Sequence, residues 1–337
     1  AYASDYIKVS QIDPHRDLSE TRELAVTYGV EELDVVILAY QDKFHVIHNE
    51  DLVKTEYEVL ASSSFPSQID FLGEVVISSA IKNLVQGHQP HVYFLQGHGE
   101  RDLASFDEYH GYSDFARMVR RDNILLRPLV LGGRSTMPDD AEALVIAAPM
   151  KKMSQPELDI LHDYMERSGR ILLMLEPLND GGLKPLLTDW GIEIRDDIVV
   201  DATQTLKGRE LVISEYGNHP ITAPLQGVSA VFYLPRSVSA LPVADSVADP
   251  SDRPKAVVLA SSSELGWAES DVKQQPLKFN PGEDRPGPVS IAIAVERGVD
   301  AVLDTEIPPT RLIAFGDSDF VANGAFTGGN PDLILSA

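Results

Sequence analysis

The chain has 337 residues, of which 43% are hydrophobic and 24% charged, with 52 acidic residues against 28 Lys and Arg. These proportions are typical of globular domains, and the length favours two domains over one. The net charge of −24 disfavours nucleic acid and anionic membrane surfaces as partners, because like charges repel. Since there is no cysteine, the sequence excludes disulfides, thiolate nucleophiles and cysteine-ligated metal sites.

The sequence also bears on cellular location. No stretch is long and apolar enough to span a membrane, and no signal peptide is recognisable. Because the chain opens at Ala1 without an initiator Met, we expect it to be the excised soluble part of a larger protein. The lack of cysteine suits an extracytoplasmic location.

Strand and helix patterns predict a first domain over residues 1–88. Its expected elements are a strand over residues 6–12, a helix over 19–29, a hairpin of 34–40 and 43–48, a loop over 61–68 and a helix over 71–85. This order resembles the second half of a thioredoxin-like fold, and residues 12–30 (IDPHRDLSETRELAVTYGV) carry the resemblance. The redox cysteines and the Pro before the central hairpin strand of that fold are absent, so the resemblance implies a structural or docking module without redox activity.

Strands and helices alternate in the predicted second domain, residues 89–337. The expected strands before the middle of the chain are residues 92–95, 124–131, 142–148 and 170–175. A well-marked helix lies between Ser154, its N-cap, and Gly169, with Pro156 in its first turn. The alternation predicts an α/β fold with a parallel, doubly wound sheet. Its adjacent central strands should be residues 92–95, 144–148, 171–175 and 312–315.

Residues from about 196 to 295 are less regular and predict a β-rich insertion. Strand patterns occur at residues 197–201, 228–233, 256–260 and 289–295, separated by loops rich in Pro, Asp and Gly. Beyond the insertion, residues 310–315 return to a buried strand, and a helix is expected from Phe320 onward.

Two charged, glycine-flanked turns follow apolar strands, one at Gly97–Asp102 and the other at Gly316–Phe320. Because the carboxyl ends of parallel strands meet at one edge of a sheet, we expect both turns to border a single crevice. His98 should lie close enough to Asp317 or Asp319 for a direct or water-bridged contact. The candidate crevice residues, for binding or for structure, are His98, Glu100, Glu176, Asp317, Ser318 and Asp319.

Two interpretations of these residues stay open. His98, Glu100, Asp102, Asp317 and Asp319 form a mixed nitrogen and oxygen ligand set suited to Mg²⁺, Mn²⁺ or Ca²⁺. In the alternative, the two aspartates cap the following helix, His98 bonds within its turn, and backbone donors satisfy Glu176. We favour the structural interpretation, and we therefore expect no bound metal and no cofactor.

Nucleophilic catalysis finds little support in the sequence. A cysteine nucleophile is ruled out, and Gly316–Phe320 lacks the second glycine of a serine elbow. Acidic neighbours on both sides of Ser318 would also disfavour an alkoxide. We expect no catalytic residue, and the alternative is a metal-assisted hydrolase that uses the crevice between Gly97–Asp102 and Gly316–Phe320.

Several motifs in order resemble the GldG-like auxiliary proteins of ABC transporters, a family named for gliding motility. These motifs are VYFLQGHGERDL at 92–103, LVIAAPMKKMSQPELDILHDYMERSGRILLMLEP at 144–177, DDIVVD at 196–201, HPIT at 219–222 and IAFGDSDFVAN at 313–323. The resemblance implies a fold similar to class I glutamine amidotransferases, which intraflagellar-transport proteins share, and a non-catalytic accessory or binding role. It also implies a periplasmic region tethered to the inner membrane through helices outside this chain. The expected partners are ABC transporter membrane subunits and other proteins, and the sequence leaves homo-oligomerisation open.

Overall fold

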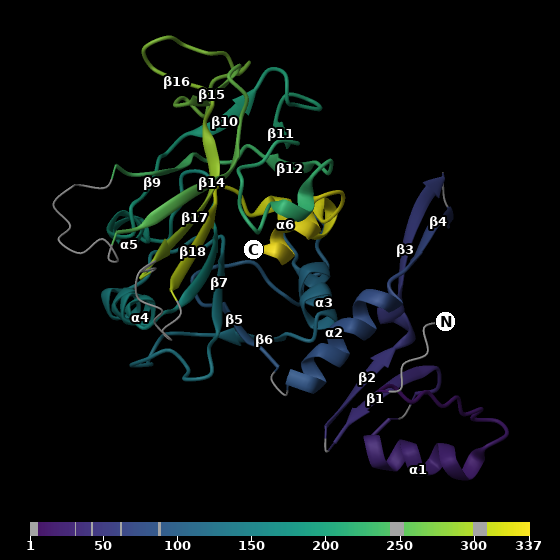
Figure 1. The fold of residues 1–337 in the computed structure, drawn as a ribbon. Coiled ribbons are helices and arrows are strands. Elements are labelled where there is room, and N and C mark those ends of the chain that lie inside the picture. The colour runs from purple at the N-terminus through teal and green to yellow at the C-terminus, as the bar shows by residue number, and fades with distance from the viewer. Residues whose placement is uncertain are drawn as a thin grey trace. The chain divides into compact units, whose positions relative to one another are not determined.

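The computed structural model describes residues 6–30, 32–41, 43–60, 63–86, 89–242, 253–298 and 309–337. The chain forms two compact units (Figure 1). The first unit comprises Ala1–Gln89 with Arg121–Asn123, and the second comprises Pro90–Arg120 and Ile124–Ala337. Among the described helices, none is long and apolar enough to cross a bilayer. That residues 1–88 and 89–337 are separate domains stays a prediction.

Within its described residues, the first unit contains three helical segments and two separate hairpins. Its elements are α1 (Leu18–Tyr28), β1 (Val35–Tyr40), β2 (Lys43–His48), the 3₁₀ helix η1 (Asn49–Leu52), β3 (Val53–Leu60), β4 (Ser63–Phe71) and α2 (Gly73–Gln86). Antiparallel pairing joins β1 to β2 and β3 to β4. Ile47, Val76 and Ala80 form the small core between the first hairpin and α2. The thioredoxin-like character of this unit stays a prediction.

Two expectations for the first unit are wrong. Residues 6–12 form no strand, and Tyr6 and Val9 are 98% and 90% exposed, so no apolar burial stabilises an extended segment there. Residues 63–68, expected in a loop, belong to β4 instead. Pro66 lies beside a register irregularity of the β3–β4 ladder, where a residue without an N–H is tolerated.

The second unit is built around one large sheet. Its elements up to the middle of the chain are β5 (His91–Leu95), α3 (Ser113–Arg121), β6 (Leu125–Leu129), β7 (Ala143–Ala147), α4 (Gln155–Glu166), β8 (Arg170–Met174), α5 (Lys184–Asp189), β9 (Ile192–Ile194) and β10 (Ile198–Asp201). The remaining elements are β11 (Glu210–Ile213), η2 (Ala223–Leu225), β12 (Ala230–Tyr233), β13 (Val238–Ala240), β14 (Lys255–Ser261), β15 (Gly266–Glu269), β16 (Arg285–Pro286), β17 (Ser290–Arg297), β18 (Thr310–Phe315), η4 (Asp319–Val321), η5 (Asn323–Ala325) and α6 (Asn330–Ser336).

The seven strands of the central sheet are ordered β14-β17-β18-β8-β7-β5-β6. The four strands expected at the centre are adjacent and parallel, which confirms that prediction. The sheet is mixed rather than wholly parallel, because β17 pairs antiparallel with both β18 and β14. Strands β14 and β17 both come from the expected β-rich insertion. A continuous apolar run is compatible with a parallel or an antiparallel strand, so the sequence pattern did not reveal the orientation of these two strands.

Helices cover both faces of this sheet (Figure 1). Phe94, Phe115 and Ile313 belong to the core on the side of α3 and α6. Leu95, Leu161 and Trp190 belong to the core on the side of α4 and α5. Neighbouring strand residues such as Phe94 and Leu95 thus serve opposite cores, as the alternation of side chains along a strand requires. This arrangement is doubly wound, while the specific flavodoxin-like or amidotransferase-like fold stays a prediction.

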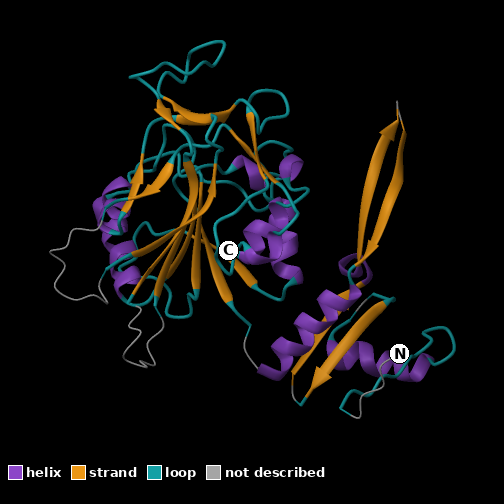
Figure 2. Ribbon diagram, turned by 45° about the horizontal axis from the view of Figure 1, so that its top comes forward, coloured by secondary structure: helices purple, strands orange, loops and turns teal. Residues whose placement is uncertain are grey.

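The chain after β18 differs from the expected helix. Two 3₁₀ turns, η4 and η5, precede a short α6 that begins only at Asn330. Figure 2 shows short helical segments close to the C-terminus. Gly324, Gly328 and Gly329 interrupt the helical pattern, because glycine disfavours a continuous helix. Pro331 then lies in the first turn of α6, where the missing N–H costs nothing.

Candidate functional site

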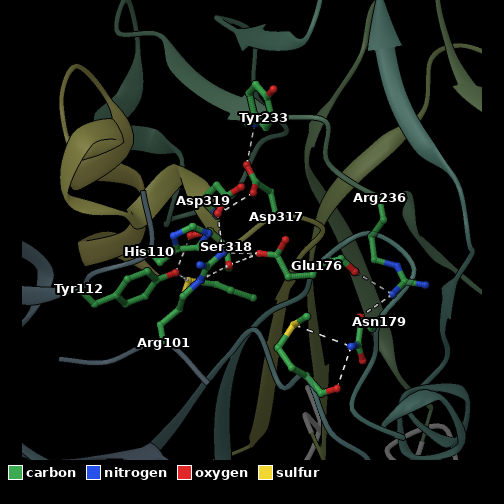
Figure 3. Close-up of polar contacts among 12 residues, drawn as sticks. Arg101, His110, Tyr112, Glu176, Asn179, Tyr233, Arg236, Asp317, Ser318 and Asp319 are labelled. Atoms are coloured by element: carbon green, nitrogen blue, oxygen red, sulfur yellow. Dashed lines mark hydrogen bonds and ion pairs between the residues drawn. The ribbon is translucent and has the colours of Figure 1, made fainter. Parts of the chain in front are cut away.

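Residues that follow β5, β8 and β18 meet at the carboxyl edge of the central sheet (Figure 3). Arg101 follows β5, Glu176 follows β8, and Ser318 and Asp319 follow β18. These four residues bond to one another, and with Asp317 and Tyr112 they form what we call the strand-end cluster. The two glycine-flanked turns therefore share one site.

Arg101 is the cation of this cluster and is only 8% exposed. Its Nη2 lies 2.8 Å from Glu176 Oε1 and 2.5 Å from Asp319 Oδ1, and its Nε donates to Ser318 Oγ at 2.9 Å. Burial opposes the charge of the guanidinium, but the charges of Glu176 and Asp319 outweigh that effect and raise the pKa of Arg101. The guanidinium thus holds the ends of three strands together.

Ser318 is fully buried, and its hydroxyl is engaged on both sides. Its Oγ accepts the bond from Arg101 and donates to Glu176 Oε1. Its carbonyl oxygen accepts a bond of 2.5 Å from the hydroxyl of Tyr112. A serine that is closed off from solvent and bonded in this way is poorly placed to attack a substrate.

Asp317 is also fully buried and links the turn to β12. Its Oδ2 accepts the backbone N–H of Tyr233, and its Oδ1 accepts that of Asp319, both at 2.7 Å. Burial raises the pKa of Asp317 well above its usual range, and the charges of Asp319 and Glu176 add to the effect. The expected capping of an α-helix by Asp317 is not found, because the 3₁₀ turn η4 begins here and its N-cap residue is Ser318.

One grouping in the described chain has the spacing of a cation site. Carboxyl oxygens of Glu176, Asp317 and Asp319 lie within 4.8 Å of one another. However, Arg101 already bonds to two of these groups, and both oxygens of Asp317 accept backbone N–H groups. The guanidinium therefore supplies the positive charge that a metal ion would bring.

His98 lies in a second cluster, formed with other carboxylates. Its Nδ1 is 3.1 Å from Glu100 Oε1, and its Nε2 is 3.2 Å from Glu157 Oε2. Both ring nitrogens therefore face carboxylates other than the expected Asp317 or Asp319. Glu157 belongs to the capping box of α4, where it also accepts bonds from Ser154. His98 thus joins the β5 turn to the start of α4 and does not contribute to the strand-end cluster.

Asp102, the remaining member of the expected ligand set, points its carboxylate back into its own turn. Its Oδ1 accepts the backbone N–H of Ala104 at 2.8 Å. The sequence interpretation thus grouped three residues of the β5 turn with the strand-end carboxylates, whereas the structure separates them.

Sequence reasoning missed Arg101 and Tyr112. A signal for Arg101 was present in the sequence. Carboxylates that converge at a buried edge need a cation, and Arg101 lies within the Gly97–Asp102 turn itself. Tyr112 carried no such signal, since its role depends on a bond to Ser318, which is 206 positions away in the chain. Burial raises the pKa of Tyr112 well above its usual range, so its hydroxyl acts as a donor.

Arg101 and Tyr112 flank residues 102–111, which we call the 102–111 loop. The loop closes on itself, because Tyr112 donates its N–H to the carbonyl of Asp102 at 3.0 Å. Asn323 Nδ2 donates to the carbonyls of Ser105 and Asp107 at 3.0 and 2.9 Å. Gly111 is required inside the closure, since an added Cβ would lie 2.2 Å from the carbonyl oxygen of Ser105. The strand-end cluster and Asn323 therefore hold the loop at both ends and in the middle.

A hollow of about 470 Å³ lies elsewhere in the second unit and is lined by residues 214–219, 222, 223, 226 and 227. It includes His219 of the HPIT motif, whose Nδ1 accepts the N–H of Ile221 at 3.2 Å. Burial lowers the pKa of His219. The hollow shares no residue with the strand-end cluster.

Comparison with known proteins places the chain in a family. Residues 89–336 match a family described as "ABC-type uncharacterized transport system". Because this match covers most of the sequence, the chain belongs to that family, whose members are auxiliary components of ABC-type transport systems. No curated protein matches the sequence.

Among solved structures, the chain is similar to one titled "mmIFT52 N-terminal domain". The two share 18% sequence identity with a TM-score of 0.48, and the similarity covers 72% of this chain and 93% of that chain.

Proposed function

We propose that the chain is a non-catalytic binding component of an ABC transport system of the gliding-motility, GldG-like type. The family supplies the transport context. The observation that supports a non-catalytic role is the closed bonding of the strand-end cluster, in which Arg101, Glu176, Ser318 and Asp319 satisfy one another. A site built for chemistry would instead direct such groups toward a substrate.

The metal-assisted hydrolase that the sequence left open is not proposed. Arg101 takes the position that a cation would need between Glu176 and Asp319, and His98 is bonded to other carboxylates. Metal-assisted hydrolysis also needs coordination positions open to water, whereas Asp317 and Ser318 are fully buried.

We further propose a periplasmic location, with tethering to the inner membrane by helices outside this chain. The resemblance of the quoted motifs to GldG-like proteins supports this location, and so does the lack of cysteine. The partners would then be the membrane subunits of the transporter and other proteins bound to it.

Purification of the full-length protein tests the proposed role. From membranes solubilised in mild detergent, a tagged full-length protein should bring down the membrane and ATPase subunits of one ABC transporter in a constant ratio. The matched control is the full-length protein lacking residues 89–336, the part that carries the family match. Recovery of the full-length protein without transporter subunits, or equal recovery with the truncated control, would contradict the proposal.

A further inference from the structure

The 102–111 loop presents two aromatic side chains to solvent. Phe106 is 87% exposed and Tyr109 is 69% exposed. A mobile loop could turn such side chains inward, but this one is held by Asn323 and by the bond from Gly324 N–H to the carbonyl of Glu108, at 2.7 Å. Because these bonds already hold the backbone, binding to these side chains would cost little further backbone entropy.

The loop also carries three carboxylates. Asp102, Asp107 and Glu108 are all exposed in the same loop. Asp107 accepts the backbone N–H groups of His110 and Tyr109, at 2.8 and 3.0 Å, and these bonds lower its pKa. The loop therefore combines aromatic side chains on a held backbone with exposed carboxylates, of which Asp107 has a lowered pKa. Rigid aromatic residues supply much of the binding energy in protein interfaces, and their faces attract Arg and Lys.

We propose that the 102–111 loop is a docking surface for an apolar segment of another protein that carries Lys or Arg. The apolar side chains of the segment pack on Phe106 and Tyr109, and its cations lie between the rings and the carboxylates of Asp107 and Glu108. The inference deepens the proposed accessory role and rests on it, because it specifies the chemistry of the partner.

Charge selects this occupant over three others. A second copy of the chain would bring two acidic loops face to face, and each copy carries a net charge of −24. An anionic membrane surface or a nucleic acid would be repelled for the same reason. A basic segment is attracted, and desolvation of its cation against Tyr109 strengthens the contact.

A peptide titration tests the docking surface. The probe is a short capped peptide of alternating Leu and Arg, and binding to the whole chain is followed by amide chemical shifts at physiological ionic strength. Shifts should concentrate in residues 102–111. Phe106→Ala and Tyr109→Ala should each weaken binding about tenfold or more. The same peptide with Glu in place of Arg should not bind.

Matched controls separate the loop from the overall charge. Leu206→Ala removes another exposed apolar side chain (70% exposed) and should leave binding unchanged. Glu108→Lys should weaken binding several-fold more than Glu283→Lys, although both change the net charge equally and both residues are exposed. Equal effects of the two charge reversals, unchanged binding by Phe106→Ala, or dimerisation through Tyr109 in sedimentation would each overturn the inference. If these tests fail while the full-length protein still co-purifies with the transporter, the docking inference alone is lost.

Discussion

Asp317 is fully buried between the end of β18 and β12, where burial raises the pKa of its carboxyl group. The protonated side chain is thus favoured in the folded protein at pH values where the unfolded chain has already lost the proton. Because its pKa is raised, Asp317 stabilises the fold at low pH, and this contribution is lost as the pH rises through the pKa of the group in the folded protein. An increase of one in this pKa corresponds to about 1.4 kcal/mol in the free energy of unfolding.

Asp317→Asn should therefore gain stability relative to the unmodified chain as the pH rises from about 4 toward neutrality. The free energy of unfolding, measured in urea at a series of pH values, checks this difference. Asp201→Asn is the matched control, because bonds from Ser263 and Thr203 outweigh burial and lower the pKa of Asp201. Because the pKa of Asp201 lies below its value in the unfolded chain, the stability difference between that variant and the unmodified chain should stay constant from about pH 5 to neutrality and should shrink only as the pH falls below about 4. Parallel pH curves for Asp317→Asn and the unmodified chain would contradict the assignment.

The 102–111 loop is the element that the strand-end cluster supports. Arg101 at one end bonds to Glu176, Ser318 and Asp319, and Tyr112 at the other end bonds to the carbonyl of Ser318. Loss of the buried cation leaves two carboxylates at the sheet edge without their partner, a change that typically costs about 3–5 kcal/mol. The loop should then loosen together with the edge of the sheet.

Arg101→Gln should lower the free energy of unfolding by about 3–5 kcal/mol and speed amide hydrogen exchange at Gly111 and Tyr112. Arg311→Gln is the matched control, because Arg311 is half exposed and pairs with Glu296, so its loss should cost about 0–1 kcal/mol. If Arg101→Gln does not fold, Ser318→Ala supplies the milder test, with a loss of about 1 kcal/mol and the same pattern of faster exchange. Unchanged exchange in the loop of either variant would show that the cluster does not hold it.

Elements with a strong local signal could be predicted from the sequence. The helix beginning after Ser154 has its capping box and an early Pro, and the structure forms α4 there. The helix expected from Phe320 did not form, because Asn323 and Gly324 donate their backbone N–H groups to the distant carbonyls of Gly111 and Glu108, and residues 319–325 form 3₁₀ turns instead. Local propensity decides an element only where tertiary contacts do not compete with it.

At the scale of the whole molecule, the lack of cysteine makes the location testable. A full-length protein with Glu264→Cys should react with a membrane-impermeant maleimide when the outer membrane is permeabilised, since residue 264 is exposed. Ala147→Cys is the buried control, with 0% exposure, and should react only after unfolding. Labelling of Glu264→Cys that requires lysis of the inner membrane would place the chain in the cytoplasm and contradict the periplasmic proposal.

The sequence by itself determined the α/β class, the four adjacent parallel strands and the meeting of the two glycine-flanked turns. These features depend on local patterns, namely apolar runs, capping residues and turn residues, and on the rule that parallel strands end at one edge. Family membership also followed from motifs that are contiguous in the chain.

Only the tertiary structure decided which side chains at that edge bond to one another. In the folded protein Arg101 bonds to Glu176 and Asp319, and His98 bonds to Glu100 and Glu157. The fold also pairs β17 antiparallel with β18. The physical reason is that a buried charge takes the partner that the packed backbone brings within bonding distance, and this distance does not depend on separation in the sequence. Packing likewise fixed the 102–111 loop, whose anchor Asn323 lies more than 200 residues further along the chain.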